Sequence, residues 1–168
     1  MKQPNTMSTQ STSETLTIGL ARFPDDQESV QAIFREYVQS PQADLGFQNY
    51  ETEFANLPGA YAQPQGCVML VQRNHTVVGC AALRQIDPNT CELKRVYLRP
   101  DVRGNQNGKR LVLSMIQQAR AIGYQRICLD VLPEFQTAQR LYENLGFTDA
   151  PPVSFNPVPG TRFMALKL

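Results

Sequence analysis

The sequence lacks the features that mark several large classes of protein. In 168 residues it has no tryptophan, one histidine and four cysteines, and its net charge is +1. Because a nearly neutral chain carries no broad basic field, we expect no nucleic-acid partner and no membrane partner. No apolar run approaches the roughly 20 residues of a membrane span. The first residues also lack the apolar stretch of a secretory signal.

The spacing of cysteine and histidine excludes a metal site. Cys67, Cys80, Cys91 and Cys128 form no CxxC pair, and His75 joins none of them in a zinc-binding pattern. Each cysteine falls in or beside an apolar, strand-like run. This placement is typical of small buried side chains in a reducing cytoplasm. We therefore predict a cytoplasmic protein that binds no metal.

Length and composition predict one folded domain behind a polar tail. Hydrophobic residues make up 42% of the chain and charged residues 18%, which is enough for a packed core. Residues 1–14 are rich in serine, threonine and glutamine, and we predict a disordered tail there. Residues 15–168 are predicted to form the domain.

The first half of the chain is predicted to form a strand and a helix, followed by a β-meander. Thr15–Arg22 alternates as a strand, and Asp25 is placed to cap the helix that follows. Phe47–Ala55 is a candidate short helix. Three further strands, joined by tight turns, are predicted over Cys67–Arg73, Thr76–Ile86 and Cys91–Arg99.

Helices and strands alternate in the second half. Helices are predicted over Gly108–Ile122 and Phe135–Leu145, and strands over Arg126–Leu132 and Arg162–Leu168. The helix between Cys91–Arg99 and Arg126–Leu132 serves as a crossover, so these two strands are predicted to be parallel neighbours. The expected α/β fold is one mixed, mostly antiparallel sheet with helices on both faces.

The segment between the Cys91–Arg99 strand and the next helix suits an anionic ligand. Residues 103–108 lie just ahead of a helix, where free N–H groups and the helix dipole favour negative charge. Glycines let the backbone approach closely, and Arg99, Arg103, Lys109 and Arg110 add cationic side chains. A diphosphate fits this pattern, although a plain turn explains it as well. The fingerprints of dinucleotide and Walker-type phosphate loops are absent, which argues against NAD and ATP.

The same segment resembles motif A of the GCN5-related N-acetyltransferase (GNAT) family, Q/R-x-x-G-x-G/A. Arg103 stands at its first position and Gly108 at its last, while Gln106 replaces the middle glycine. Leu141–Phe147 (Leu-Tyr-Glu-Asn-Leu-Gly-Phe) is similar to the family's downstream motif. The resemblance covers Thr15–Leu168. It implies an enzyme that uses acetyl-CoA, and a sheet whose central parallel pair is splayed apart.

The resemblance also implies which residues hold the co-substrate. In the family, a bulged strand pairs with the pantetheine arm, here at Val96, Tyr97 and Leu98. The loop that would hold the pyrophosphate consists of Arg103, Gly104, Asn105, Gln106, Asn107, Gly108 and Lys109. A positive φ at Gln106 would cost about 1 kcal/mol. Phe135 stands where many members have an asparagine, so one polar contact with the co-substrate is lost.

Acetyl transfer to an amine, by direct attack in a ternary complex, needs a base and a stabilised leaving thiolate. A primary amine with a pKa near 10.4 is almost fully protonated at pH 7. Glu92 is the candidate base, because many family members place a glutamate comparably; an ion pair with Lys94 or Arg95 is the alternative. Tyr142 matches the family's motif tyrosine and is the candidate acid, whereas periodicity alone makes it a packing residue.

The acceptor is expected to be chosen by two variable loops, Pro41–Gly66 and Pro151–Gly160. Arg162, which follows the second loop, is a candidate partner for a substrate carboxylate. A small-molecule amine is the favoured acceptor because the chain is short and both loops are obstructive. The alternatives are a peptide or protein N-acetyltransferase and a catalytically weak acyl-CoA-binding sensor. A homodimer is left open.

Overall fold

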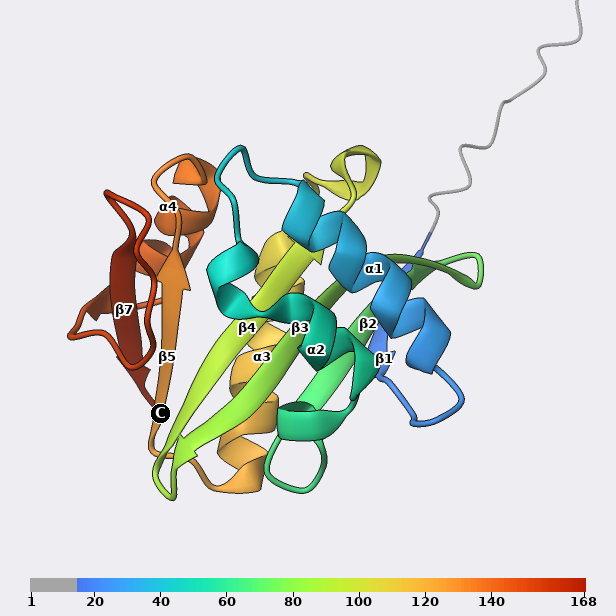
Figure 1. Ribbon diagram of the computed structural model, residues 1–168, viewed down its shortest axis with the longest axis horizontal. Coiled ribbons are helices and arrows are strands. Elements are labelled where there is room, and N and C mark those ends of the chain that lie inside the picture. Colours follow the sequence, from blue (N-terminus) through green and yellow to red (C-terminus); the bar gives the residue numbers. More distant parts are fainter. Residues whose placement is uncertain (1–14) are drawn as a thin grey trace, which may run out of the picture.

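A computed structural model describes residues 15–168, which form one seven-stranded sheet. The strand order is β1-β2-β3-β4-β5-β7-β6 (Figure 1). All neighbouring strands are antiparallel except β4 and β5, which are parallel. The predicted mixed, mostly antiparallel α/β sheet is therefore confirmed. The predicted tail, residues 1–14, lies outside the described residues.

The elements agree closely with the predicted ranges. The strands are β1 Leu16–Leu20, β2 Cys67–Arg73, β3 Thr76–Asp87, β4 Thr90–Leu98, β5 Arg126–Val131, β6 Thr148–Asp149 and β7 Arg162–Lys167. The helices are α1 Gln27–Gln39, α2 Tyr50–Ala55, α3 Asn107–Ile122 and α4 Gln136–Asn144. Short 3-10 turns lie at η1 Gly46–Gln48, η2 Gly59–Tyr61 and η3 Pro100–Val102. Strand β6 was not predicted, because two exposed residues are too few to show an alternation.

Two local predictions need correction. Helix α1 starts at Gln27, so Asp26 rather than Asp25 precedes it. The Asp26 Oδ2 accepts the Arg22 N–H at 2.7 Å and makes no bond to the helix itself. The candidate helix Phe47–Ala55 is divided at Asn49, whose φ of 52° places it in the left-handed region. That residue ends η1 before α2 begins.

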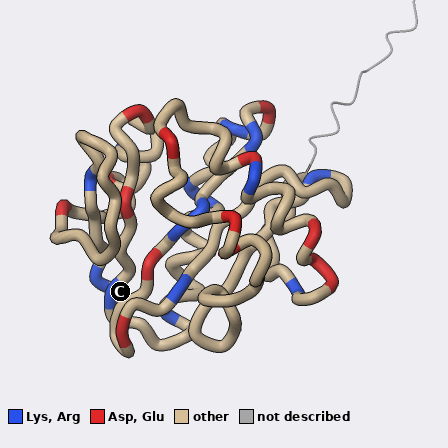
Figure 2. Tube along the Cα trace, viewed as in Figure 1, with Lys and Arg blue, Asp and Glu red and all other residues tan. Residues whose placement is uncertain are grey.

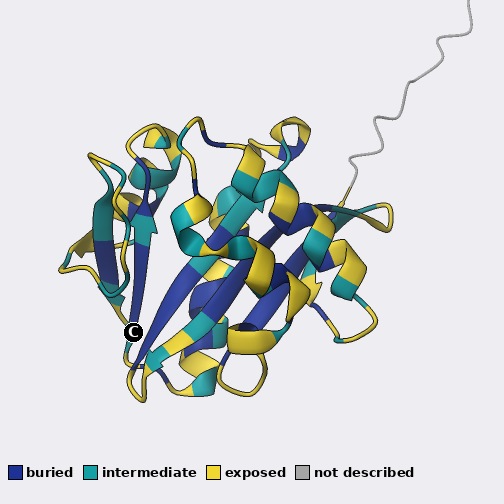
Figure 3. Cartoon of the chain, in the orientation of Figure 1, coloured by how far each residue is buried: buried dark blue, intermediate teal, exposed yellow. Residues whose placement is uncertain are grey.

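Helices cover the sheet on both faces and create two cores (Figures 1 and 3). On the face called here the α3 face, α3 and α4 pack over a core that includes Leu83, Leu111 and Ile127. On the opposite α1 face, α1 and α2 pack over a core that includes Phe34 and Phe54. Since side chains alternate along a strand, membership of one core tells which face each neighbouring residue occupies.

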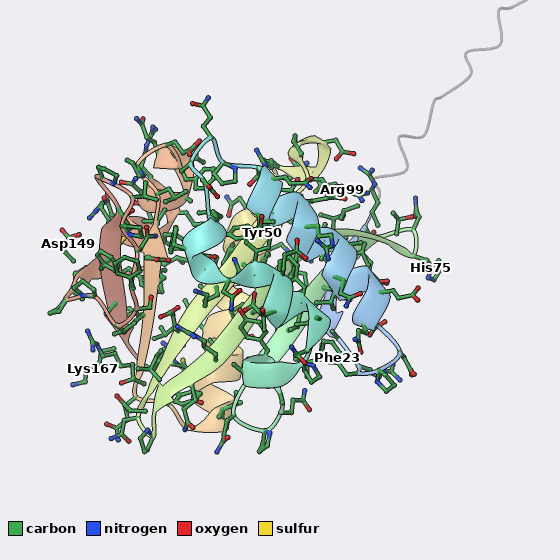
Figure 4. The ribbon with its side chains drawn as sticks, in the orientation of Figure 1. Phe23, Tyr50, His75, Arg99, Asp149 and Lys167 are labelled. Carbon is green, nitrogen blue, oxygen red and sulfur yellow. The ribbon has the colours of Figure 1, made fainter. Side chains whose placement is uncertain are left out.

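The four cysteines are buried and free, as their apolar surroundings predicted. Burial raises the pKa of the Cys67 thiol to about 11 and that of Cys91 to about 12. These thiols therefore stay protonated and unreactive at neutral pH. His75 lies at the tip of the β2–β3 hairpin, remote from the other labelled side chains (Figure 4).

Charge is spread over the molecule, with acidic and basic residues interspersed along the trace (Figure 2). Within residues 15–168, no helix is long and apolar enough to cross a membrane. Nor do the described residues contain a group of three or more His, Cys, Asp or Glu side chains that could hold a metal ion.

Candidate active site

Strands β4 and β5 pair only at their first residues and then separate. Their parallel register consists of Thr90 with Arg126, Cys91 with Ile127, and Glu92 with Cys128. Beyond these pairs β4 continues to Leu98 and β5 to Val131 without pairing to each other. The two strands diverge in Figure 1. We call this opening the wedge; it confirms the predicted splayed parallel pair.

A β-bulge shapes the edge of β4 that borders the wedge. The β3–β4 register shifts between Cys80 and Ala82, and Arg95 has a φ of 57°. Gly79 permits the close approach of the two strands there, because a Cβ at this position would lie 2.5 Å from the Leu98 Cδ2. Val96, Tyr97 and Leu98, the positions expected to bind pantetheine, directly follow the bulge.

The loop after β4 has an unusual backbone. Gly104, Asn105 and Gln106 have φ values of 94°, 49° and 59°, so three consecutive residues are left-handed. The sequence left open whether Gln106 adopts a positive φ, and it gave no sign of one at Asn105. Each non-glycine residue in this region costs on the order of 1 kcal/mol. The loop stores this strain directly ahead of α3.

Strain in the loop accompanies a set of free N–H groups. Helix α3 has 16 residues, so its dipole places partial positive charge at this end. Within residues 15–168, five amides here donate no backbone hydrogen bond: Gly104, Asn105, Gln106, Gly108 and Lys109. Such an array fits a pyrophosphate, because each phosphate oxygen can accept from several N–H groups.

The cationic side chains near the loop have different partners. The Arg99 guanidinium binds the Glu36 carboxylate, with an Nη2–Oε1 distance of 2.6 Å. The Arg103 Nε donates to the Leu98 carbonyl at 2.9 Å, so this side chain folds back on β4. Lys109 is exposed and makes no hydrogen bond or ion pair with another described residue. Lys109 is therefore the cation best placed to meet a phosphate.

Glu92 lies on the α1 face, because Cys91 and Leu93 beside it belong to the α3-face core. Its side chain is only 1% exposed. Two cations surround its carboxylate: the Arg84 Nη2 and the Lys94 Nζ each lie 3.3 Å from Oε1. Of the predicted ion-pair partners, Lys94 is thus present and Arg95 is not. The Arg84 Nε is the one buried side-chain polar atom in the described residues without a hydrogen-bond partner.

Arg95 instead ties α2 to the bulge. Its Nη2 lies 2.6 Å from the Glu53 Oε2, and its Nη1 also donates to the Gln48 side chain. The guanidinium stacks over the Tyr37 and Phe54 rings at 5.4 and 5.6 Å from their centroids. Burial alone would lower the pKa of Arg95. The neighbouring tyrosines and Glu53 outweigh burial, so the pKa of Arg95 is raised above its ordinary value. This buried cation stays charged and fixes the segment above β4.

Tyr142 projects from α4 and is 5% exposed. Its ring packs on Phe147, with 5.6 Å between the centroids. Burial, followed by the Tyr37 side chain and the Asp130 charge, raises the pKa of Tyr142 well above its ordinary value. This phenol is consequently a weaker acid than tyrosine in water. It suits hydrogen-bond donation to a sulfur better than full proton transfer.

Arg162, the candidate partner of a substrate carboxylate, is paired with two carboxylates of this chain. It pairs in register with Val131, whose side chain belongs to the α3-face core, so both residues point to that face. There its Nη1 lies 2.5 Å from the Glu143 Oε1, and its Nη2 lies 2.9 Å from the Asp149 Oδ1. Asp149 lies at the outer side of the molecule (Figure 4). Both of its ion pairs are thus within this chain, and a substrate carboxylate at Arg162 stays a prediction.

The two variable loops meet beside the wedge. The Phe47 and Phe155 rings contact each other edge to face, with 6.1 Å between centroids. The Asn156 Nδ2 donates to the Asp130 Oδ2 at 2.9 Å, which joins the second loop to β5. Sequence reasoning missed Asp130. Its one signal was an acidic residue within the apolar run of a strand.

A separate surface pocket lies beside β1 and is unrelated to the wedge. It is lined by residues that include Leu20, Arg22, Phe23, Pro58 and Tyr61. Its lining includes no carboxylate, and its one thiol, Cys67, stays protonated because burial raises the pKa of that group to about 11.

Comparison with known proteins identifies the family. Residues 28–147 match the family model described as Acetyltransferase (GNAT) family, so the chain belongs to the GNAT family. An uncharacterised N-acetyltransferase of Schizosaccharomyces pombe is 35% identical over 155 residues, which cover 91% of this chain and 95% of that protein. The chain is therefore an N-acetyltransferase with acetyl-CoA as its acyl donor, and the resemblance found in the sequence is confirmed.

Solved structures show the same fold. An acetyltransferase from Streptococcus agalactiae superposes with a TM-score of 0.75 at 24% identity, covering 91% of this chain and 98% of that one. YncA of Salmonella typhimurium, solved with acetyl-CoA, superposes with a TM-score of 0.63 at 24% identity, covering 90% and 93% of the two chains.

Proposed function

We propose that this N-acetyltransferase acetylates the primary amine of a small molecule, by direct attack of the amine on acetyl-CoA in a ternary complex. The wedge is the observation that carries the proposal. Pairing between β4 and β5 ends at Glu92, and the free edge of β4 leads to the free amides ahead of α3. A thioester bound along this edge is open to attack from the α1 face.

The co-substrate would be held mainly by backbone groups. Val96, Tyr97 and Leu98 offer the strand edge that pairs with an extended pantetheine arm. The N–H groups of the loop Arg103–Lys109 receive the pyrophosphate, and the exposed Lys109 adds a positive charge. In this proposal Arg103 braces the loop through the Leu98 carbonyl rather than contacting phosphate.

Tyr142 is proposed to donate a hydrogen bond to the thioester sulfur. Its raised pKa keeps the phenol protonated at every working pH. The role of Glu92 as the base stays a prediction, and the contacts of its carboxylate favour the alternative, a structural ion pair. Its carboxylate already holds Arg84 and Lys94, each 3.3 Å from Oε1, which leaves it fewer acceptor positions for a substrate ammonium group.

The loops favour a small acceptor over a peptide. The contact between Phe47 and Phe155 joins the first variable loop to the second, and a peptide acceptor needs an open groove between such loops. Gln42 also donates its N–H to the Glu134 carboxylate at 3.2 Å, which links the first loop to the segment after β5. A homodimer stays a prediction.

Calorimetry with acetyl-CoA, followed by a free-thiol assay over a panel of primary amines and peptides, tests the proposal. We expect saturable acetyl-CoA binding and turnover of small amines. Absence of acetyl-CoA binding would contradict the proposed function. Binding without turnover of any amine would support the sensor alternative, and turnover of peptides alone would support the peptide alternative.

A further inference from the structure

A second carboxylate, Asp130, lies at the wedge on the same face as Glu92. Leu129 and Val131 on either side of it belong to the α3-face core, so Asp130 points to the α1 face. It stands two residues beyond Cys128, the last β5 residue paired with β4. Its position is therefore about 7 Å further along the strand, where the wedge has opened.

Asp130 has much unused hydrogen-bonding capacity. The Asn156 Nδ2 donates to one of its oxygens at 2.9 Å, and the described residues provide no cation within ion-pair distance of it. A carboxylate offers about four acceptor sites. The side chain is half-buried, so its charge is only partly hydrated and remains open to an incoming donor.

The charge of Asp130 reaches two tyrosines on other elements. The charge of Asp130 contributes, after burial, to the raised pKa values of Tyr37 on α1 and Tyr142 on α4. Burial is the largest cause for both phenols, and the pKa of Tyr37 reaches about 12. Arg95, whose charge lowers the pKa of Tyr37, is itself ion-paired with Glu53 at 2.6 Å. The surroundings of Asp130 thus combine a carboxylate that lacks an ion-pair partner with two tyrosines that stay protonated. Such an arrangement attracts an ammonium group.

We propose that Asp130 binds the ammonium group of the acceptor and accepts its proton, so that the attacking amine forms at this residue. The inference rests on the proposed function, because it names the proton acceptor of that reaction. Glu92, with its two cations, then serves as a fixed charge at the foot of the wedge.

Acetyl transfer to the amine begins with a proton transfer and ends with the loss of coenzyme A. One ammonium proton passes to the Asp130 carboxylate, and the freed nitrogen lone pair forms a bond to the thioester carbonyl carbon. The carbonyl π pair moves to oxygen and then returns as the carbon–sulfur bond breaks. Sulfur leaves with that bonding pair and is protonated, while the nitrogen loses its second proton. The products are an N-substituted acetamide, free coenzyme A thiol and one proton released to solvent.

Asp130→Asn tests this assignment, because asparagine keeps an oxygen for Asn156 but removes the charge. At pH 7 we expect kcat/KM for the best amine of the panel to fall by about 100-fold or more, with acetyl-CoA affinity unchanged. The deficit should narrow as pH rises toward 9.5, since the neutral fraction of an amine with a pKa near 10.4 grows about tenfold per pH unit. Tyr37 and Tyr142 stay protonated throughout. Arg95 and Glu53 are the other charged residues whose fields reach Tyr37, and Glu92 with Arg84 and Lys94 forms the ion cluster at the foot of the wedge.

Two control variants separate chemistry from structure. Asp149→Asn removes a carboxylate on the α3 face and should leave kcat/KM unchanged. Asn156→Ala removes the loop contact and keeps the Asp130 charge, so its loss should be smaller and independent of pH. Asp130→Ser repeats the test if the asparagine variant no longer binds acetyl-CoA.

The outcomes distinguish the two proposals. A wild-type enzyme that turns over no amine contradicts the proposed function itself. An active wild type with an equally active Asp130→Asn variant overturns the inference alone. Equal, pH-independent losses in Asp130→Asn and Asn156→Ala would assign Asp130 to anchoring the loop, which also overturns it.

Discussion

Glu92 and Asp130 are two carboxylates on the same face of adjacent strands, and their surroundings differ sharply. Glu92 is 1% exposed and lies 3.3 Å from each of two cations, Arg84 and Lys94. Asp130 is half-buried and accepts one bond from a neutral amide, that of Asn156. A carboxylate that two cations already hold has few free acceptor positions, whereas one without a cation is available to a substrate. The resemblance to the family points to Glu92 as the base, whereas the lack of a neighbouring cation leads us to propose Asp130 for proton transfer.

The comparison predicts that Glu92 matters most for stability. Glu92→Gln leaves Arg84 and Lys94 without their shared counter-charge, so the free energy of unfolding should fall by about 3 kcal/mol. For a domain of this size that corresponds to a decrease in Tm of roughly 10 °C. Denaturant unfolding measures it. Glu51→Gln, which removes half of an exposed ion pair with Arg35, is the control and should cost less than about 1 kcal/mol.

A Glu92→Gln protein as stable as the wild type would show that the buried pair contributes nothing, and the contrast with Asp130 would lose its physical basis.

Tyr142→Phe tests the leaving-group side of the site. Loss of the phenol hydroxyl should lower kcat by roughly tenfold, the size of one modest hydrogen bond to the developing thiolate. Acetyl-CoA affinity should stay the same. The raised pKa of Tyr142 also predicts no alkaline loss of wild-type activity from this group below pH 10. Tyr50→Phe, a tyrosine substitution on α2, is the matched control; unchanged kcat in Tyr142→Phe would remove Tyr142 from its role.

Substitutions of the loop glycines Gly104 and Gly108 test acetyl-CoA binding independently of Glu92 and Asp130. Gly104 has a φ of 94°, so Gly104→Ala forces an alanine into a strained backbone although its Cβ would meet nothing within 4 Å. Acetyl-CoA affinity should fall by about fivefold, or roughly 1 kcal/mol. At Gly108 a Cβ would make an ordinary contact with Leu141 at 3.6 Å, so Gly108→Ala should lose clearly less affinity. Calorimetry that ranks the two variants in the opposite order would contradict the loop's assigned role.

Most of the fold follows from local sequence patterns. Helical stripes and strand alternation placed α1, α3, α4 and the meander within a few residues, because each pattern depends on residues close in sequence. The parallel pairing of β4 and β5 followed from the length of the crossover. The break in Phe47–Ala55 did not, since it depends on a left-handed backbone at Asn49.

The features of the site also differ in whether they depend on residues close in sequence or on the three-dimensional arrangement. The strain at Gln106 could be predicted only conditionally, because the missing motif glycine marks where a positive φ is costly but does not show whether the loop adopts one. The ion pairs of Arg162 with Glu143 and Asp149 could not be predicted, because a Pro-rich loop precedes β7 and the sequence does not show on which face its alternation starts. The role of Arg84 beside Glu92 and the exposure of Asp130 to the wedge both arise from strand register, which appears only in three dimensions.

The most direct measurement is the pH dependence of kcat/KM for Asp130→Asn and Glu92→Gln, side by side and normalised to folded protein. The account predicts a large deficit at pH 7 for Asp130→Asn that narrows toward pH 9.5, and a smaller, nearly constant deficit for Glu92→Gln. A large, pH-dependent deficit in Glu92→Gln, together with wild-type behaviour of Asp130→Asn, would contradict it and return the base to Glu92.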